Sequence, residues 1–223
     1  AFIGGTISTN AAGAATFKYG STRPWVVGLD LVLANGDLLQ LLRGQVVASP
    51  EGTFEIELSS GRVVTVPVPT YRMPDVAKLS AGYYAKPGMD LIDLFIGSEG
   101  TLGVIVDAHL QLIKRPRRAV VLIPCDGDEQ AVAVTAALRA DDSISAIEYI
   151  DSRALRIVPN DAFERAGIRR PASNIVLLMA QIELETKSND DAAFERLQKV
   201  LEACGVRDEV TIAAPDDERG AKR

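Results

Sequence analysis

Three glycines at intervals of three residues, Gly97, Gly100 and Gly103, give this sequence its clearest capacity for ligand chemistry. A glycine backbone can approach a ligand closely, and its amide groups can form an anion-binding nest. A dinucleotide fingerprint of the Rossmann type would open a helix here. Instead, residues 104–112 alternate between apolar and polar side chains, which is the period of a half-buried strand. This pattern excludes a Rossmann motif, and the missing Gly-Lys-Ser/Thr ending excludes a P-loop.

A second candidate is the run of small residues from Gly4 to Gly13. Such a run buries little apolar surface, so it suits a place where bare backbone packs flat against something large. A flexible Gly/Ala/Ser linker is the alternative interpretation. Larger residues interrupt the run and its continuation at intervals, as linkers rarely show: Ile3, Ile7, Phe17 and Tyr19.

Arginine and tyrosine side chains are concentrated in the connection between about Gly44 and Ala85, which contains Arg72, Tyr83 and Tyr84. An arginine with nearby tyrosines can bind a carboxylate substrate. The alternative is an insert that packs on its own surface.

The composition excludes several classes of function. The chain has 223 residues and a net charge of −6, which argues against a nucleic-acid surface. It contains no apolar run of membrane-spanning length. Cys125 and Cys204 lack metal-ligand spacing, and His109 is the single histidine, so no imidazole-based metal centre is expected. Reduced thiols and a cytoplasmic location are the expectation, with peripheral attachment to a membrane as the alternative.

Two hairpins are predicted before the glycine loop. Asn35-Gly36 is expected to supply two positive-φ positions of a tight turn, and Ser60-Gly61 turns the second hairpin. Prolines then disfavour helix and strand up to Asp75. After them, a short helix is predicted over 75–84, and a helix or turn over 91–96. Each of the two longest strands is expected to place its apolar residues on one face: Trp25, Val27, Leu29, Leu31 and Leu33 in the first, and Val104, Val106, Ala108, Leu110 and Leu112 in the second.

Beyond Pro116 the pattern predicts a second α+β unit. The basic residues around Pro116 favour a solvated seam over a phosphate site. Asp151 is predicted to cap one helix, Asn189 or Asp190 to cap another, and Gly205 to end it. The charged tail is expected to be frayed. The predicted strands cover 119–124, 146–150 and 174–182, and the helices 128–140, 151–157 and 190–204.

Three segments together resemble a known family. Gly4–Gly13 reads Gly-Gly-x-x-x-Thr-Asn-Ala-x-Gly, Tyr19-Gly20-Ser21 precedes the first hairpin, and the third segment runs from Asp90 to Ile105. In this order and spacing they resemble the FAD-linked oxidases, the PCMH-type FAD-binding fold shared by vanillyl-alcohol oxidase and by D-lactate, glycolate and D-2-hydroxyglutarate dehydrogenases. The start Ala1-Phe2-Ile3, without Met, leads us to expect a piece of a longer protein.

The resemblance implies an α+β fold with two parts. Residues 1–116, with an insert at about 44–85, resemble the rear of the FAD-binding domain, an antiparallel-rich sheet with helices. Residues 119–223 resemble the start of the α+β cap, or substrate, domain. The expected partners are a small-molecule substrate and an electron acceptor of unassigned identity.

The resemblance also implies a cofactor site for FAD built mainly from backbone. For Glu99 the alternative is a carboxylate that accepts backbone N–H groups and holds the turn. His109 is interpreted as a surface residue. The residues implied for the cofactor are Gly4, Gly5, Ile7, Thr9, Asn10, Ala11, Ala12, Gly13, Glu99, Gly100, Thr101, Gly103, Val104 and Ile105; those considered for substrate are Arg72, Tyr83 and Tyr84.

The activity that follows is an FAD-dependent oxidation of a small 2-hydroxy acid of the D-lactate or glycolate type. The α-hydrogen would leave as hydride to the flavin, while a base takes the hydroxyl proton. No residue of the chain has a strong claim to be that base. The alternatives are another alcohol substrate on the same scaffold, of the sugar-lactone or ether-lipid type, and a cofactor-free structural or interaction module.

Overall fold

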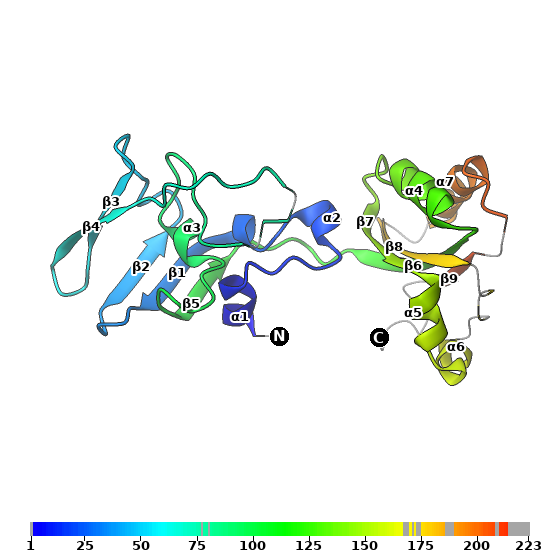
Figure 1. Ribbon diagram of the computed structural model, residues 1–223, viewed down its shortest axis with the longest axis horizontal. Coiled ribbons are helices and arrows are strands. Elements are labelled where there is room, and N and C mark those ends of the chain that lie inside the picture. The colour runs from blue at the N-terminus through cyan, green and yellow to red at the C-terminus, as the bar shows by residue number, and fades with distance from the viewer. Residues whose placement is uncertain are drawn as a thin grey trace. The chain divides into compact units, whose positions relative to one another are not determined.

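The computed structural model describes residues 2–76, 78–79, 81–166, 170, 172, 175–185, 190–207 and 210–213. The chain forms two compact units (Figure 1). The first contains Ala1–Gly13 and Gly20–Ile113, and the second contains Ala14–Tyr19 and Lys114–Arg223. The short segment Ala14–Tyr19 therefore packs with the second unit although both of its neighbours in sequence belong to the first.

The first unit is built on an antiparallel sheet in the order β2-β1-β5, which comprises Leu38–Leu42, Val26–Val32 and Val104–Leu110. A separate hairpin pairs β3 (Thr53–Glu57) with β4 (Val63–Pro67). Short helices complete its described part: α1 (Ile3–Ser8), the 3-10 helix Arg23–Trp25 and α3 (Ile92–Phe95). The predicted strand after the glycine loop, both hairpins and the helical turn near residue 92 are confirmed.

The predicted inward face of β5 was wrong at Val104 and Val106, and Leu112, predicted on the same face, is exposed beyond the end of the strand. The pairing of β1 with β5 shifts register between Asp30 and Leu31, opposite the step from Asp107 to Ile105. A bulge inserts one unpaired residue and reverses which side chains point inward. Val104 and Val106 are therefore 64% and 56% exposed, and Ile105 packs against the core instead. A second shift in β1 likewise leaves Val27 exposed while Val26 is buried.

The first hairpin turns differently from the prediction, because only Gly36 has a positive φ, at 87°. The Gly36 amide donates to Leu33 O, and the Leu33 amide donates to Asp37 O. This is a longer turn that ends in one left-handed glycine, a common alternative to the two-residue turn. Asn35 contributes through its side chain, which bonds to Asp37.

The helix predicted over 75–84 is absent from the described residues of that segment. Side chains from elsewhere use its backbone carbonyls: Asn10 donates to Leu79 O, and Tyr71 donates to Tyr83 O. Tertiary contacts therefore replace the hydrogen bonds that a helix would have made.

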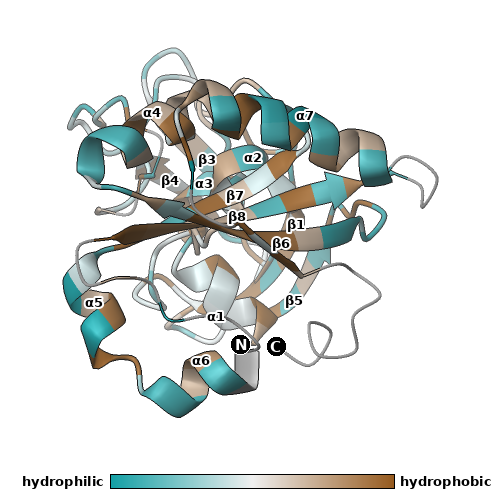
Figure 2. Ribbon diagram, turned by 90° about the vertical axis from the view of Figure 1, so that its right-hand side faces the viewer, coloured by the Kyte–Doolittle hydropathy of each residue, from teal (hydrophilic) through white to brown (hydrophobic). Residues whose placement is uncertain are grey.

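The second unit is a four-stranded antiparallel sheet in the order β7-β8-β6-β9, covered by helices on both faces (Figure 2). Helices α4 and α7 cover one face and α5 and α6 lie on the other. Asp151 caps α5 as predicted, since its carboxylate accepts from the Ala154 amide at 2.6 Å. The strands are β6 (Arg117–Cys125), β7 (Ile144–Ile150), β8 (Val176–Leu184) and β9 (Thr211–Ala213); the helices are α2 (Thr16–Tyr19), α4 (Asp128–Leu138), α5 (Ser152–Ile157), α6 (Asn160–Ala166) and α7 (Asp190–Ala203).

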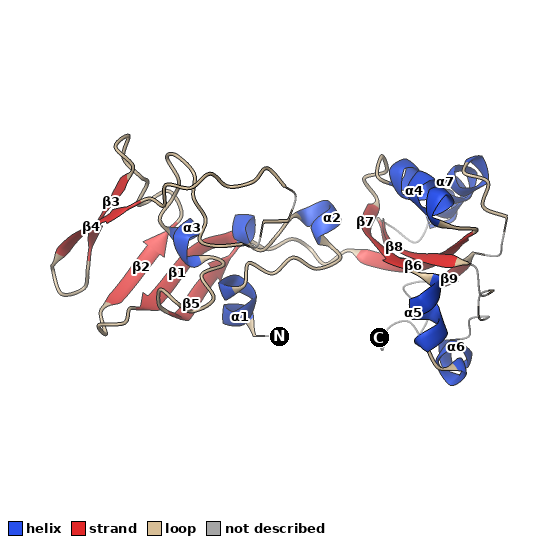
Figure 3. Ribbon diagram, viewed as in Figure 1, coloured by secondary structure: helices blue, strands red, loops and turns tan. Residues whose placement is uncertain are grey.

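Most of the predicted elements of this unit are present, while α2, α6 and β9 were not anticipated (Figure 3). Gly205 ends α7 with a φ of 74°. The predictions for Asn174, for Asn189 and for the charged tail lie outside the described residues.

Candidate functional site

Two backbone hydrogen bonds join the small-residue run to the glycine loop. The Gly97 amide donates to Ile7 O at 3.0 Å, and the Glu99 amide donates to Ser8 O at 2.8 Å. Ile7 itself is fully buried, so it fixes α1 to the core beneath the loop. Two segments about ninety residues apart in the sequence thus form one surface, as the resemblance leads us to expect.

Two non-glycine residues of this surface hold left-handed backbone, Asn10 with φ 45° and Glu99 with φ 54°. The Asn10 side chain is buried and accepts from the Arg23 amide at 2.9 Å, while its Nδ2 donates to Leu79 O at 3.2 Å. Both of its polar groups therefore serve the fold. The carboxylate of Glu99 is exposed and accepts no hydrogen bond from the described residues, so it is the Glu99 backbone that holds the turn.

Some glycines of the site are required by the fold itself. A Cβ at Gly103 would lie 3.1 Å from Val32 O, and a Cβ at Gly97 would lie 3.2 Å from the Asn10 side chain. Gly97 and Gly100 also have positive φ values, of 86° and 79°. At these positions the fold alone explains why the residue is glycine, without any ligand.

Gly5 and Gly13 are different, because nothing in the described chain requires them to be glycine. A Cβ at either position would meet no described atom within 4 Å, and neither residue has a left-handed φ. Gly5 even lies inside α1, where glycine costs roughly 0.5–1 kcal/mol relative to alanine. Bare backbone at these points leaves space for a flat or anionic group, so the surface fits a cofactor such as FAD.

The amide groups of this surface support the same interpretation. Within the described residues, the amides of Ala12, Gly13 and Gly100 have no internal hydrogen-bond acceptor. Backbone amides that are free in this way can bind phosphate or ring-edge oxygens.

The remaining cofactor candidates mostly contact neighbouring parts of the backbone. Gly4 lies beside β5, since its Cβ position is 4.0 Å from Ile105 O. The Thr9 hydroxyl donates to Gly5 O at 3.0 Å, and the Thr101 hydroxyl donates to Ser98 O at 2.6 Å. Ala11 O accepts from Thr22, and Ala12 is half-buried.

Arg23 lies beneath this surface, and no sequence motif pointed to it. Its guanidinium donates to Asp93 and, at 2.6 Å, to Ile96 O, and lies 4.2 Å from the centre of the Tyr84 ring. The side chain is 15% exposed. Burial lowers the Arg23 pKa, and the Asp93 carboxylate acts in the opposite direction. Since an arginine pKa lies far above neutrality, the group stays charged.

The three residues considered for substrate do not form one cluster. The Tyr83 hydroxyl bonds to Thr101 Oγ1 at 2.7 Å, and the Tyr84 ring packs on Arg23. The guanidinium of Arg72 is exposed and has no hydrogen-bond partner among the described residues. Arg72 and Tyr84 line one pocket of about 1000 Å³ within the insert, together with Tyr71 and Lys86.

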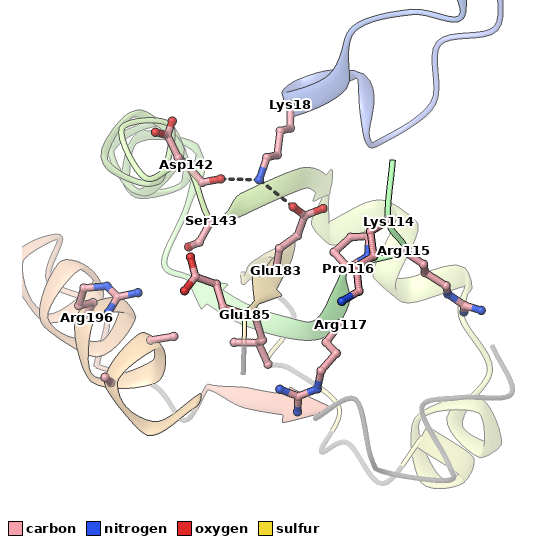
Figure 4. Close-up of a pocket in the computed structure, with 13 residues that line it drawn as sticks. Lys18, Lys114, Arg115, Pro116, Arg117, Asp142, Ser143, Glu183, Glu185 and Arg196 are labelled. Atoms are coloured by element: carbon pink, nitrogen blue, oxygen red, sulfur yellow. Dashed lines mark hydrogen bonds and ion pairs between the residues drawn. The ribbon is translucent and has the colours of Figure 1, made fainter. Parts of the chain in front are cut away.

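A second pocket, of about 930 Å³, lies in the second unit (Figure 4). There Lys18 Nζ is 2.7 Å from both the Glu183 carboxylate and Asp142 O, and the Tyr19 hydroxyl also bonds to Glu183, at 2.5 Å. Burial acts to raise the pKa of Glu183, but hydrogen bonds from Lys18 and Tyr19 outweigh it and lower this pKa below its ordinary value.

The basic residues around Pro116 partly line this second pocket. Arg117 forms two bonds to Asp190, at 2.9 and 3.1 Å, and Arg118 pairs with Glu183 at 3.2 Å. These two arginines thus serve structural ion pairs within the second unit.

Among the described residues, no group of His, Cys, Asp and Glu side chains could hold a metal ion. His109 is exposed and lies 3.8 Å from Asp107. None of the described helices is both long and apolar enough to cross a membrane.

Comparison with known proteins supports the resemblance that the sequence motifs indicate. Residues 1–42 match the model of the FAD binding domain family. The chain is 27% identical over 221 residues to glycolate oxidase subunit GlcD of Bacillus subtilis, covering 98% of this chain and 37% of the relative. It is 34% identical over 157 residues to D-2-hydroxyglutarate dehydrogenase of Xanthomonas citri pv. viticola, covering 70% of this chain and 25% of the relative.

A third relative is D-lactate dehydrogenase of Archaeoglobus fulgidus, 26% identical over 98% of this chain and 39% of the relative. The chain thus spans less than half the length of these curated relatives. Among solved structures, alkyldihydroxyacetonephosphate synthase matches with a TM-score of 0.56 and 17% identity, over 99% of this chain and 35% of that chain. The TM-score supports a shared fold, and at 17% identity the likeness extends to the fold alone.

Proposed function

We propose that this relative of the FAD-linked oxidases is part of an FAD-dependent oxidoreductase that oxidises a small 2-hydroxy acid. Three of its relatives carry the names glycolate oxidase, D-2-hydroxyglutarate dehydrogenase and D-lactate dehydrogenase. All three names describe acids with a hydroxyl on the carbon next to the carboxylate, so this substrate class is the one that they share.

The observation that carries the proposal is the pair of glycines, Gly5 and Gly13, whose missing side chains the chain itself does not explain. They lie on the run that is hydrogen-bonded to the glycine loop. In our proposal the free amides of Ala12, Gly13 and Gly100 bind the cofactor, while Gly5 gives it room to approach.

When bound, FAD would supply the acceptor for the hydride that leaves the substrate α-carbon. The chain's own contribution is to hold and orient. The backbone of the run and of the loop fixes the cofactor, and the bond from the Glu99 amide to Ser8 O holds the loop against the run. In the insert pocket, the uncommitted Arg72 is our candidate for the substrate carboxylate, since a guanidinium matches a carboxylate in charge and geometry.

The test uses the purified protein that contains this chain. We expect the absorbance bands of oxidised flavin after incubation with FAD, and bleaching of these bands when a D-2-hydroxy acid is added without oxygen. A dye-reduction assay over glycolate, D-lactate and D-2-hydroxyglutarate then identifies the substrate. Absence of flavin binding would refute the proposal, and flavin binding with reduction only by other alcohols would refute the substrate class.

A further inference from the structure

We propose that Arg23 is a positioning residue that sets the distance between the small-residue run and the glycine loop. The inference deepens the proposed function, on which its relevance to FAD rests. Arg23 contacts both halves of the surface, although it belongs to neither and faces away from the solvent.

On the side of the run, the Arg23 amide donates to Asn10 Oδ1 at 2.9 Å. Asn10 is the residue whose left-handed backbone ends the turn after α1. Arg23 thus fixes the point where the chain leaves α1 and enters the segment with the free amides of Ala12 and Gly13.

On the side of the loop, the Arg23 guanidinium donates to the last carbonyl before the glycines, Ile96 O, and to Asp93 of α3. One of its nitrogens would lie 3.6 Å from a Cβ at Gly97. The planar guanidinium therefore supports the start of the loop from beneath. A lysine keeps the charge but cannot reach several acceptors in fixed directions, so it cannot replace these contacts.

Tyr84 completes the arrangement, because its ring lies 4.2 Å from the guanidinium carbon. Cation–π stacking of this kind restricts the plane of the guanidinium. Tyr84 also lines the insert pocket that contains Arg72. The same ring therefore touches the proposed substrate pocket and the residue that supports the cofactor loop.

Arg43 provides a matched control within the same cluster. It pairs with the same carboxylate, at 3.1 Å from Asp93 Oδ1, and its other bonds go to Arg23 O and Val26 O. It makes no hydrogen bond to the glycine loop among the described residues. Arg43→Lys therefore disturbs the ion pair with Asp93 and the bond to Arg23 O, but it removes no hydrogen bond made to the glycine loop by the described residues.

The experiment compares Arg23→Lys with Arg43→Lys by two measurements. The first is hydrogen exchange of the Gly97 and Glu99 amides in the FAD-free protein, which reports on the bonds to Ile7 O and Ser8 O. We expect protection at these amides to fall about tenfold or more in Arg23→Lys, and to remain unchanged in Arg43→Lys. The second is the dissociation constant for FAD, which should rise about tenfold in Arg23→Lys alone.

A third variant, Tyr84→Leu, tests the same idea without removing the guanidinium. It should lower protection at both amides by less than Arg23→Lys does. It also serves as the test if Arg23→Lys does not fold. If the Gly97 and Glu99 amides are as protected in Arg23→Lys or Tyr84→Leu as in wild type, the inference is wrong. It is also wrong if Arg43→Lys loses as much protection at these amides as Arg23→Lys does.

The two proposals fail separately. If the wild-type protein binds no FAD while the exchange results are as expected, the proposed function is wrong and the role of Arg23 in the fold stands. If FAD binds equally well to wild type and to Arg23→Lys, the positioning role toward the cofactor is wrong.

Discussion

The amide of Glu99 donates to the carbonyl of Ser8 across 2.8 Å, and this bond closes the candidate cofactor surface. Glu99 adopts a left-handed φ of 54° to make it, a conformation that is uncommon for a residue with a side chain. Its carboxylate meanwhile stays in solvent. This bond joins the loop, which carries the free Gly100 amide, to the run, which carries the free amides of Ala12 and Gly13.

Replacing Gly5 by alanine should raise stability and lower cofactor affinity at the same time. Alanine in the interior of α1 should add roughly 0.5–1 kcal/mol, because it restricts the unfolded chain and its Cβ meets no described atom. The same Cβ would occupy space that we assign to FAD. Thermal unfolding of the FAD-free protein and flavin titration measure the two effects.

The matched control for this change is Gly127→Ala in the second unit, where a Cβ also meets no described atom. It should leave FAD affinity as in wild type. If Gly5→Ala binds FAD as tightly as wild type, Gly5 does not face the cofactor.

Replacing Gly103 by valine should destabilise the first unit whether or not FAD is present. The new Cβ would begin 3.1 Å from Val32 O, a backbone atom that cannot move without disturbing the pairing of β1 with β5. Overpacking of this kind costs about 1–3 kcal/mol. Denaturant unfolding of the FAD-free protein should show the loss; unchanged stability would mean that Gly103 is kept for the ligand instead.

Removing the charge of Arg72 should weaken substrate binding more than turnover. If its guanidinium holds the substrate carboxylate in both ground and transition states, Arg72→Gln should raise KM about tenfold or more with little change in kcat. Lys86→Gln in the same pocket is the control. The measurement is steady-state kinetics with the 2-hydroxy acid that is oxidised best. An unchanged KM in Arg72→Gln would show that Arg72 does not bind the substrate.

Glu183 should make the stability of the second unit depend on pH. Its pKa is lower in the folded protein than its ordinary value of 4.5, because hydrogen bonds from Lys18 and Tyr19 outweigh the effect of burial. The contribution of the carboxylate is therefore fully present above pH 4.5 and is lost as the pH falls through the folded-state pKa.

The measurement is thermal unfolding of wild type and Glu183→Gln between neutral and acid pH. The variant should unfold at a lower temperature at neutral pH, and the difference should shrink toward acid pH. Glu185→Gln, at an exposed carboxylate next to the end of β8, is the control and should unfold like wild type. A difference that is independent of pH would show that the Glu183 charge is not what matters.

Local sequence was sufficient for most of the elements. Alternating residues predicted β5, and the turn glycines predicted both hairpins. Asp151 predicted the cap of α5, because a cap depends on atoms only three residues apart. The motifs at Gly4–Gly13 and after Asp90 also indicated the resemblance to the FAD-linked oxidases, and the relatives and the match over residues 1–42 support that resemblance.

Only the tertiary structure decided which residues face the core and which residue supports the glycine loop. The bulge that exposes Val104 and Val106 depends on the register between β1 and β5. In the segment 75–84, where a helix was predicted, backbone carbonyls instead accept hydrogen bonds from Asn10 and Tyr71. Arg23 joins the run to the glycine loop through partners 13 and 73 residues away. A periodic pattern reports burial along one element, whereas these contacts depend on where separate elements meet, and that is fixed only when the chain packs.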